Sequence, residues 1–148
     1  MTRAWLALLV VAGLGCTGRY VRPTTQEAVA ASEDRVARGN YLVNSVMSCG
    51  ACHSPRVGGT WLGGERADAY LAGGSVFDDP ENNFKVSTPN ITQDRETGIG
   101  AWTDDEIMRA IRDGIHRDDD RLRYPPMPFY MYDTLSDDDV RAVVAYLR

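Results

Sequence analysis

The 148-residue chain is poor in the residues that cross-link domains or bind metals, with only three cysteines and two histidines. One cysteine stays unpaired by any scheme, so an intramolecular disulfide framework is not expected. Two histidines are too few for a multi-histidine metal site. Basic residues are outnumbered by acidic ones, 16 to 21, and the net charge is −5. Because no basic stripe is visible either, nucleic acid is excluded as a partner.

The chain also lacks an apolar run long enough to cross a membrane as a helix of the mature protein. Residues 5–14 are apolar but short, and Arg3 precedes them, so residues 1–15 are predicted to be an export signal. The run ends at Gly13-Leu14-Gly15-Cys16, which resembles a bacterial lipoprotein cleavage site, although that pattern prefers leucine where Gly13 stands. We expect Cys16 to become a lipidated N-terminus that anchors a periplasmic protein to a membrane. The alternative is an ordinary signal with a stray cysteine.

Residues 16–31 follow the signal and contain Pro23 without a clear apolar period. They are predicted to be a flexible tether between the anchor and the folded domain, which we place at residues 32–148.

The five residues Cys49-Gly50-Ala51-Cys52-His53 form a C-x-x-C-H motif, the attachment sequence of a c-type haem. Two thiols three positions apart on a helical turn can each add to one of the two vinyl groups at a haem edge. The next residue, His53, then lies under the ring, where an imidazole nitrogen can bind the iron. Cys49 and Cys52 are therefore predicted to hold the haem covalently and His53 to be an axial ligand. A single motif and two histidines exclude a multihaem chain.

Three helices are predicted around this motif. Ser32 is a plausible N-cap for a helix that leads to Cys49. Thr103 and Glu106 fit a capping box at the start of a second helix. The third helix begins after Ser136, where three aspartates lie at the positive end of the helix dipole, and it continues to the last residue, Arg148.

The stretch from Ser54 to Gly100 is rich in glycine, proline, asparagine and aspartate and has no sustained period. So long an irregular segment is unusual in a compact domain, but a bound haem can supply the apolar surface on which it packs. No strand-rich region and no internal repeat is visible. The sequence therefore predicts an all-α domain with long irregular loops.

The iron's second axial position has several candidate ligands. Met47 is too near Cys49 to reach across the ring, Met108 lies inside the second helix, and His116 is expected at the surface near a helix end. Met127 is favoured because Pro126 and Pro128 restrict its backbone and can hold a thioether at a fixed distance from iron. Met131 is the next candidate, and an open position is the remaining alternative.

The chain resembles a monohaem class I cytochrome c, and more closely the cytochrome c domains of the cytochrome subunits of membrane-bound alcohol and aldehyde dehydrogenases. The stretches that carry this resemblance span about residues 37–148. They are Arg38-Gly39-Asn40-Tyr41-Leu42-Val43, Leu71-Ala72-Gly73-Gly74, Thr88-Pro89-Asn90-Ile91-Thr92, Thr97-Gly98-Ile99-Gly100-Ala101-Trp102-Thr103, Pro126-Met127-Pro128-Phe129, Leu135-Ser136-Asp137-Asp138 and Ala145-Tyr146-Leu147-Arg148. The dehydrogenase subunits carry several haem motifs, whereas this chain has one.

The resemblance implies a class I cytochrome c fold of three to five helices around one covalently bound haem c. It implies that Met127 is the axial methionine and that a proline carbonyl orients His53. It also implies a close crossing of the first and last helices, with Gly39 facing an aromatic residue, Tyr41 or Tyr146. Trp102 and Asn90 are candidate contacts of a haem propionate, with core packing and loop capping as the alternatives.

The function that follows is electron transfer rather than enzymatic catalysis: single electrons would pass between redox protein partners, such as a dehydrogenase, reductase or oxidase. A haem-based sensor or a small haem enzyme is the alternative, and it requires a displaceable sixth ligand. A structural zinc site is disfavoured because Cys49 and Cys52 have no second C-x-x-C partner. A thioredoxin-like motif would need a βαβ setting, which the pattern does not show.

Overall fold

The computed structural model describes residues 23–60, 62–118 and 126–148. The predicted export signal, Cys16 and residues 17–22 of the predicted tether lie outside the described residues. Within the described ranges, no helix combines the length and the apolar character needed to cross a membrane.

The chain enters the domain through a nearly continuous helical segment. Helix α1 (Glu33–Tyr41) begins after Ser32, whose side chain caps it as expected, and it runs directly into a π-helical turn, Leu42–Val46. Helix α2 (Cys49–His53) follows after Ser48, which adopts the left-handed conformation with φ 51°. Because a left-handed residue changes the direction of the chain, α2 begins as a separate helix and carries all three predicted haem-binding residues of the motif.

The second predicted helix is α3 (Asp104–Arg112), and its capping box is present. Thr103 Oγ1 accepts the backbone N–H of Glu106, and the Glu106 carboxylate accepts the backbone N–H of Thr103. Gly114 follows with φ +69°, a conformation that favours glycine and stops the helix. The predicted start of this helix is confirmed.

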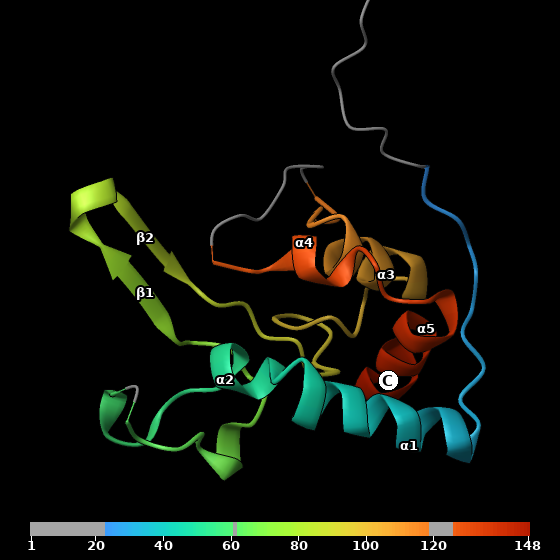
Figure 1. Ribbon diagram of the computed structural model, residues 1–148, viewed down its shortest axis with the longest axis horizontal. Helices are drawn as coiled ribbons and strands as arrows, with labels where there is room; N and C mark the ends of the chain where they lie inside the picture. The colour runs from blue at the N-terminus through green and yellow to red at the C-terminus, as the bar shows by residue number, and fades with distance from the viewer. Residues whose placement is uncertain (1–22, 61, 119–125) are drawn as a thin grey trace, which may run out of the picture.

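Helix α5 (Asp137–Leu147) is the third predicted helix, capped by Ser136. It crosses α1 at the expected glycine: a Cβ added to Gly39 would lie 1.9 Å from the Ala142 carbonyl oxygen and 2.7 Å from Tyr146 Cβ. Figure 1 shows the two helices crossing. Tyr146 is therefore the aromatic residue at this crossing, whereas Tyr41 is 54% exposed.

One more short helix, α4 (Phe129–Tyr132), lies between α3 and α5 in the sequence. The buried core joins the π-helical turn, α3 and α5, with contributions from the irregular segment. Its residues are Leu42, Val43, Met47, Leu71, Ile99, Ile107, Met108, Ile111, Val140, Ala142, Val143, Val144 and Leu147.

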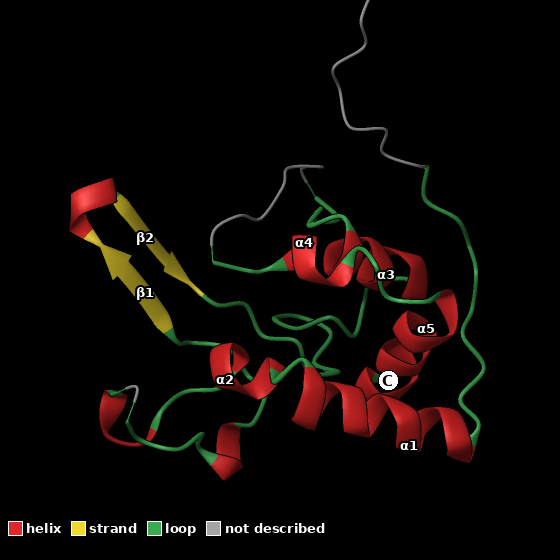
Figure 2. Cartoon of the chain, viewed as in Figure 1, coloured by secondary structure: helices red, strands yellow, loops and turns green. Residues whose placement is uncertain are grey.

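The structure is consistent with the expected all-α fold, but part of the irregular segment also forms a small two-stranded sheet. Strands β1 (Val76–Asp79) and β2 (Phe84–Ser87) form an antiparallel hairpin joined by a 3₁₀ turn, Pro80–Asn82, and by Asn83 at φ 49°. Figure 2 shows this hairpin extending away from the helices. Each strand has only four residues, so its alternation of half-buried and exposed side chains is too short to stand out as a periodic signal. The described part of the chain otherwise contains five α-helices, with further 3₁₀ turns at Val57–Gly59 and Ala67–Ala69.

The described part of the predicted tether lies against the domain. The backbone N–H of Thr25 donates to the Asp105 carboxylate at 2.6 Å, and that of Val29 donates to the Asp104 carboxylate at 2.6 Å. Glu27 pairs with Arg141 of α5 at 2.6 Å. Residues 25–29 are thus held on α3 and α5, while the domain boundary at Ser32 stays a prediction.

Candidate haem site

Helix α2 places the two thiols and the imidazole of the motif within one short turn of chain. Cys49 and Cys52 are both free and half-buried, and His53 ends the helix. Since residues three apart lie on the same side of a helix, both thiols can face one edge of a planar group. Burial raises the pKa of the Cys49 thiol to about 11 and also raises the pKa of the Cys52 thiol.

Gly50, between the two cysteines, has a structural reason to be glycine. A Cβ at this position would lie 2.3 to 2.8 Å from the ring and hydroxyl of Tyr70. The Tyr70 hydroxyl in turn donates to the Asn44 side chain on the π-helical turn, and Asn44 donates to the Tyr146 hydroxyl at 3.0 Å. The back of the haem-binding helix is therefore packed against Tyr70 and linked to α5.

His53 is oriented by a backbone carbonyl from the irregular segment. Its Nδ1 lies 2.9 Å from the Pro89 oxygen, and because a carbonyl can only accept, Nδ1 carries the proton. Nε2 is then the nitrogen with a lone pair for a metal ion. Burial lowers the pKa of His53, and the bond to Pro89 acts in the opposite direction.

Pro89 was not singled out from the sequence, although the resemblance implied that some proline carbonyl would fill this role. Pro89 lies 36 positions after His53, in the stretch Thr88-Pro89-Asn90-Ile91-Thr92 that carries the resemblance. Pro55 and Arg56, two and three positions after His53, make other contacts. Arg56 donates to the Ala51 carbonyl of α2 at 2.7 Å, and the Pro55 ring lies near Gly74.

The backbone around Gly73 fixes the distance between His53 and Pro89. Gly73 N–H donates to the His53 carbonyl at 2.7 Å, and Gly74 N–H donates to the Thr88 carbonyl at 2.9 Å. Gly73 has φ +75°, and a Cβ there would lie 2.6 Å from backbone atoms of Pro89 and Asn90. The close approach therefore requires glycine at this position.

Ser54, directly after the motif, adds a second buried connection to the same segment. Its hydroxyl accepts Leu71 N–H at 2.9 Å, and its carbonyl accepts the Ser75 hydroxyl at 2.7 Å. Both serines are buried. The end of α2 is thus fixed from two sides, which limits the movement of the His53 ring.

Met127 lies two residues before the start of α4. It is half-buried, and Phe129 two residues later is buried. The Phe129 ring packs on Gly114: a Cβ there would lie 2.4 to 2.8 Å from ring atoms. The segment that carries Met127 is therefore anchored at its C-terminal end.

The other candidate axial ligands have different environments. Met47 and Met108 are buried in the hydrophobic core, and Met131 is 62% exposed. His116 packs edge-on against Trp102, with ring centroids 4.8 Å apart. Met127 and His116 are both half-buried and lie outside the core, but the ring of His116 is packed against Trp102.

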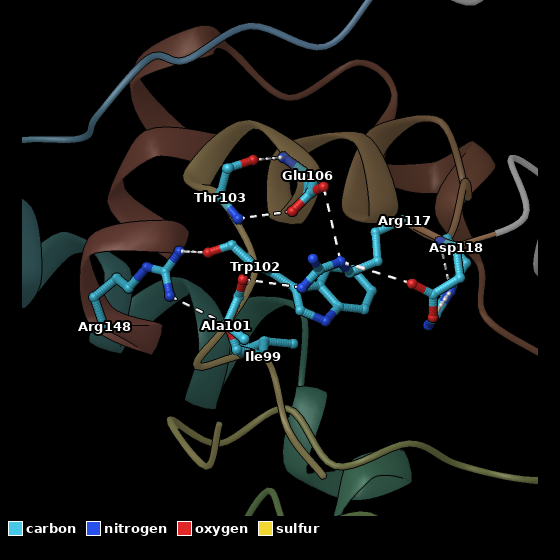
Figure 3. Close-up of polar contacts among 9 residues, drawn as sticks. Ile99, Ala101, Trp102, Thr103, Glu106, Arg117, Asp118 and Arg148 are labelled. Carbon is cyan, nitrogen blue, oxygen red and sulfur yellow. Dashed lines mark hydrogen bonds and ion pairs between the residues drawn. The ribbon is translucent and has the colours of Figure 1, made fainter. Parts of the chain in front are cut away.

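Trp102 lies in a polar cluster at the start of α3, drawn in Figure 3. The Arg117 guanidinium carbon lies 6.0 Å from the centre of its ring, and Arg117 Nη1 donates to the Ala101 carbonyl at 2.9 Å. Arg148, the C-terminal residue, donates to the Trp102 carbonyl. The indole is half-buried against the core, and a contact with a haem propionate stays a prediction.

The side chain of Asn90 organises its own loop. Its oxygen accepts the backbone N–H of Thr92 at 2.8 Å and the Thr92 hydroxyl at 2.7 Å, and its amide donates to Thr97 at 2.9 Å. This is the loop-capping arrangement weighed in the sequence analysis. The propionate contact of Asn90 stays a prediction; Asn90 directly follows the residue that orients His53.

The donor set of this site matches what a c-type haem requires. Two thiols on one helical turn supply the thioether bonds, and a histidine with its Nδ1 proton committed to Pro89 supplies an axial nitrogen. Among the described residues, no group of three or more histidine, cysteine, aspartate or glutamate side chains offers an alternative metal site. Cys49, Cys52 and His53 would thus hold the haem from the α2 side.

A helical domain with this turn and this ordered histidine defines a cytochrome c domain. The chain belongs to the family described as "Cytochrome C oxidase, cbb3-type, subunit III", whose sequence profile matches residues 34–147. The resemblance to dehydrogenase cytochrome subunits is also confirmed. The chain is 36% identical over 123 residues to the cytochrome c subunit of the quinone alcohol dehydrogenase of Gluconobacter oxydans, with 79% of this chain covered.

Two further cytochromes are similar to this chain. The gluconate 2-dehydrogenase cytochrome c subunit of Pantoea cypripedii is 34% identical over 78% of this chain. A diheme cytochrome c-type protein of Cereibacter sphaeroides is 34% identical over 75% of it. The aligned part makes up 24%, 23% and 34% of these three proteins, so the chain spans about a quarter to a third of their length.

Proposed function

We propose that this domain binds one haem c and carries single electrons between protein partners. Cys49 and Cys52 form the thioether bonds, and His53 and Met127 are the axial ligands in a class I arrangement. The observation that carries the proposal is the 2.9 Å bond between His53 Nδ1 and the Pro89 carbonyl, which orients the imidazole as an iron ligand would require.

The bound haem would supply one-electron chemistry at its iron, and the chain supplies ligands and surroundings. His53 is held by Pro89, so its ring has one orientation in which Nε2 serves the metal. Met127 is placed by Phe129, and a methionine opposite a histidine raises the reduction potential.

We further propose that the domain works outside the cytoplasm, with residues 1–15 as an export signal and Cys16 lipidated. Redox partners are proposed by relationship, because the relatives are cytochrome subunits of alcohol and gluconate dehydrogenases. A haem dehydrogenase complex, a reductase or an oxidase would each fit as donor or acceptor. The acidic net charge of −5 continues to argue against nucleic acid.

Ligation is tested with the haem-loaded protein and two methionine variants. The ferric wild type is expected to show the weak long-wavelength band that reports a methionine–iron bond. Met127→Ala loses the band and opens the iron to carbon monoxide in the reduced state. Met131→Ala is the matched control and keeps the band, because Met131 is largely exposed. A high-spin wild type that binds carbon monoxide at once would instead favour a sensor or a haem enzyme.

The anchor is tested separately by changing Cys16→Ser and measuring how the protein partitions between membrane and soluble fractions. Lipidation predicts release of the variant, and mass spectrometry of the wild-type N-terminus should find an acylated cysteine. Unchanged membrane association of the variant would contradict the lipid anchor without affecting the haem site.

A further inference from the structure

Tyr132 joins the two sides of the candidate haem site. It is the last residue of α4 and lies five positions after Met127. Its hydroxyl donates to the Met47 carbonyl at 3.2 Å, although the two residues are 85 positions apart. Met47 lies two residues before Cys49, so this bond connects the methionine side of the site to the turn that enters α2.

The turn that accepts this bond is well fixed. Met47 N–H donates to the Leu42 carbonyl at 2.8 Å and closes the π-helical turn, and the Met47 side chain is buried in the core. Ser48 follows in the left-handed conformation and begins the approach to α2. The Met47 carbonyl is therefore a firm acceptor, and movement at this contact has to come from the α4 side.

The Tyr132 side chain is itself well placed to hold its position. Its ring is half-buried and packs against the hydrophobic core. Burial raises the pKa of Tyr132 to about 12, with the nearby Cys49 and Cys52 acting in the same direction, so the hydroxyl remains a donor at neutral pH. Phe129, at the other end of α4, is packed on Gly114. Helix α4 is thus fixed at both ends, and Met127 lies just before it.

We infer that Tyr132 is a positioning residue for Met127. Displacing Met127 from iron requires the segment before α4 to move away from α2, and such movement strains or breaks the Tyr132–Met47 bond. The bond therefore favours the arrangement in which the segment that carries Met127 stays close to the site. This inference rests on the proposed His53 and Met127 ligation.

The test is an imidazole titration of the ferric, haem-loaded protein, because imidazole binds only where Met127 has been displaced. Removing one hydroxyl with Tyr132→Phe should tighten the apparent binding of imidazole about threefold to tenfold, as expected for the loss of one hydrogen bond. The control is Tyr41→Phe, which removes the hydroxyl of a tyrosine that is 54% exposed on α1 and should leave the titration unchanged.

A second measurement uses the same samples. When the pH is raised, the long-wavelength methionine band should disappear at a lower pH in Tyr132→Phe than in the wild type. In Tyr41→Phe it should disappear at the same pH as in the wild type. A role in packing alone predicts a lower unfolding temperature with unchanged imidazole affinity and unchanged loss of the band, and that result would overturn the inference.

Failure of the proposed function looks different. If the wild type lacks the methionine band, the ligation proposal and this inference fail together. If the wild type shows the band and Tyr132→Phe binds imidazole as weakly as the wild type, only the role of Tyr132 is refuted.

Discussion

The Pro89 carbonyl accepts the Nδ1 proton of His53 across 36 positions of largely irregular chain. Gly73 makes this possible, because its lack of a Cβ leaves room for the Pro89 backbone and its N–H donates to the His53 carbonyl. Neither residue belongs to the haem-attachment motif. The orientation of the proposed axial histidine therefore depends on packing between two loop segments.

Replacing Gly73 with alanine should damage this arrangement. The added Cβ meets backbone of Pro89 and Asn90 at 2.6 Å, and φ +75° is strained for alanine. We expect the free energy of unfolding to fall by about 2 kcal/mol or more, with a smaller fraction of protein carrying covalent haem. Denaturant unfolding and haem staining measure the two effects.

Gly74→Ala is the matched control for this variant. Gly74 also has a positive φ, +86°, but its nearest neighbour to an added Cβ is a Pro55 ring carbon at 3.9 Å. Only the backbone strain of about 1 kcal/mol is expected there. Equal losses in the two variants would show that the contact with Pro89 contributes little.

The crossing of α1 and α5 should be equally intolerant of added volume. A Cβ at Gly39 would lie 1.9 Å from the Ala142 carbonyl oxygen, a backbone atom that can move only with its helix. Gly39→Ala is therefore expected to lower the free energy of unfolding by about 2 kcal/mol, despite the better helix propensity of alanine. Gly64→Ala, where the added Cβ meets nothing within 4 Å, should change it little, and thermal unfolding compares the two.

The ion pair between Arg38 and Asp139 should make stability depend on pH. Arg38 Nε lies 2.8 Å from the Asp139 carboxylate and holds its pKa below the ordinary value of 3.8. A carboxyl group with a lowered pKa in the folded state stabilises the protein above its ordinary pKa. That contribution disappears as the pH falls through the lowered value.

Asp139→Asn tests this expectation. The variant should be less stable than the wild type at neutral pH, and the difference should narrow below about pH 4 and close at more acidic pH. Comparing the two proteins at each pH cancels the titration of groups that they share. A difference that stays constant down to the acidic limit would assign the effect to the helix cap or to packing instead.

The segment before α1 should contribute to the stability of the domain. Asp105 is fully buried and accepts the Thr25 backbone N–H at 2.6 Å. Thr25→Pro removes this donor, and weakening the bonding of a buried carboxylate is expected to cost about 1–3 kcal/mol of unfolding free energy. Thr24→Pro changes an exposed neighbour and should cost less than about 0.5 kcal/mol. Similar unfolding midpoints for the two variants would show that residues 25–29 are bound only loosely.

Most helix starts could be predicted because capping is local. Ser32, Thr103 and Ser136 each bond to a backbone N–H three residues on, so the pattern of neighbours suffices to find them. The hairpin at Val76–Asp79 and Phe84–Ser87 was missed because four-residue strands leave almost no periodic signal. The contacts of residues 25–29 with α3 were missed because their backbone donors carry no side-chain signature.

The sequence by itself determined which side chains can hold a haem, because the spacing of Cys49, Cys52 and His53 on one turn is a local covalent requirement. It also pointed to Met127 through the prolines beside it. Only the tertiary structure decided which distant partners these segments have: Pro89 for His53, and Met47 for Tyr132, which follows the segment of Met127. Those partners lie 36 and 85 positions apart, and such pairs are set by how loops and helices pack, which no short stretch of sequence specifies.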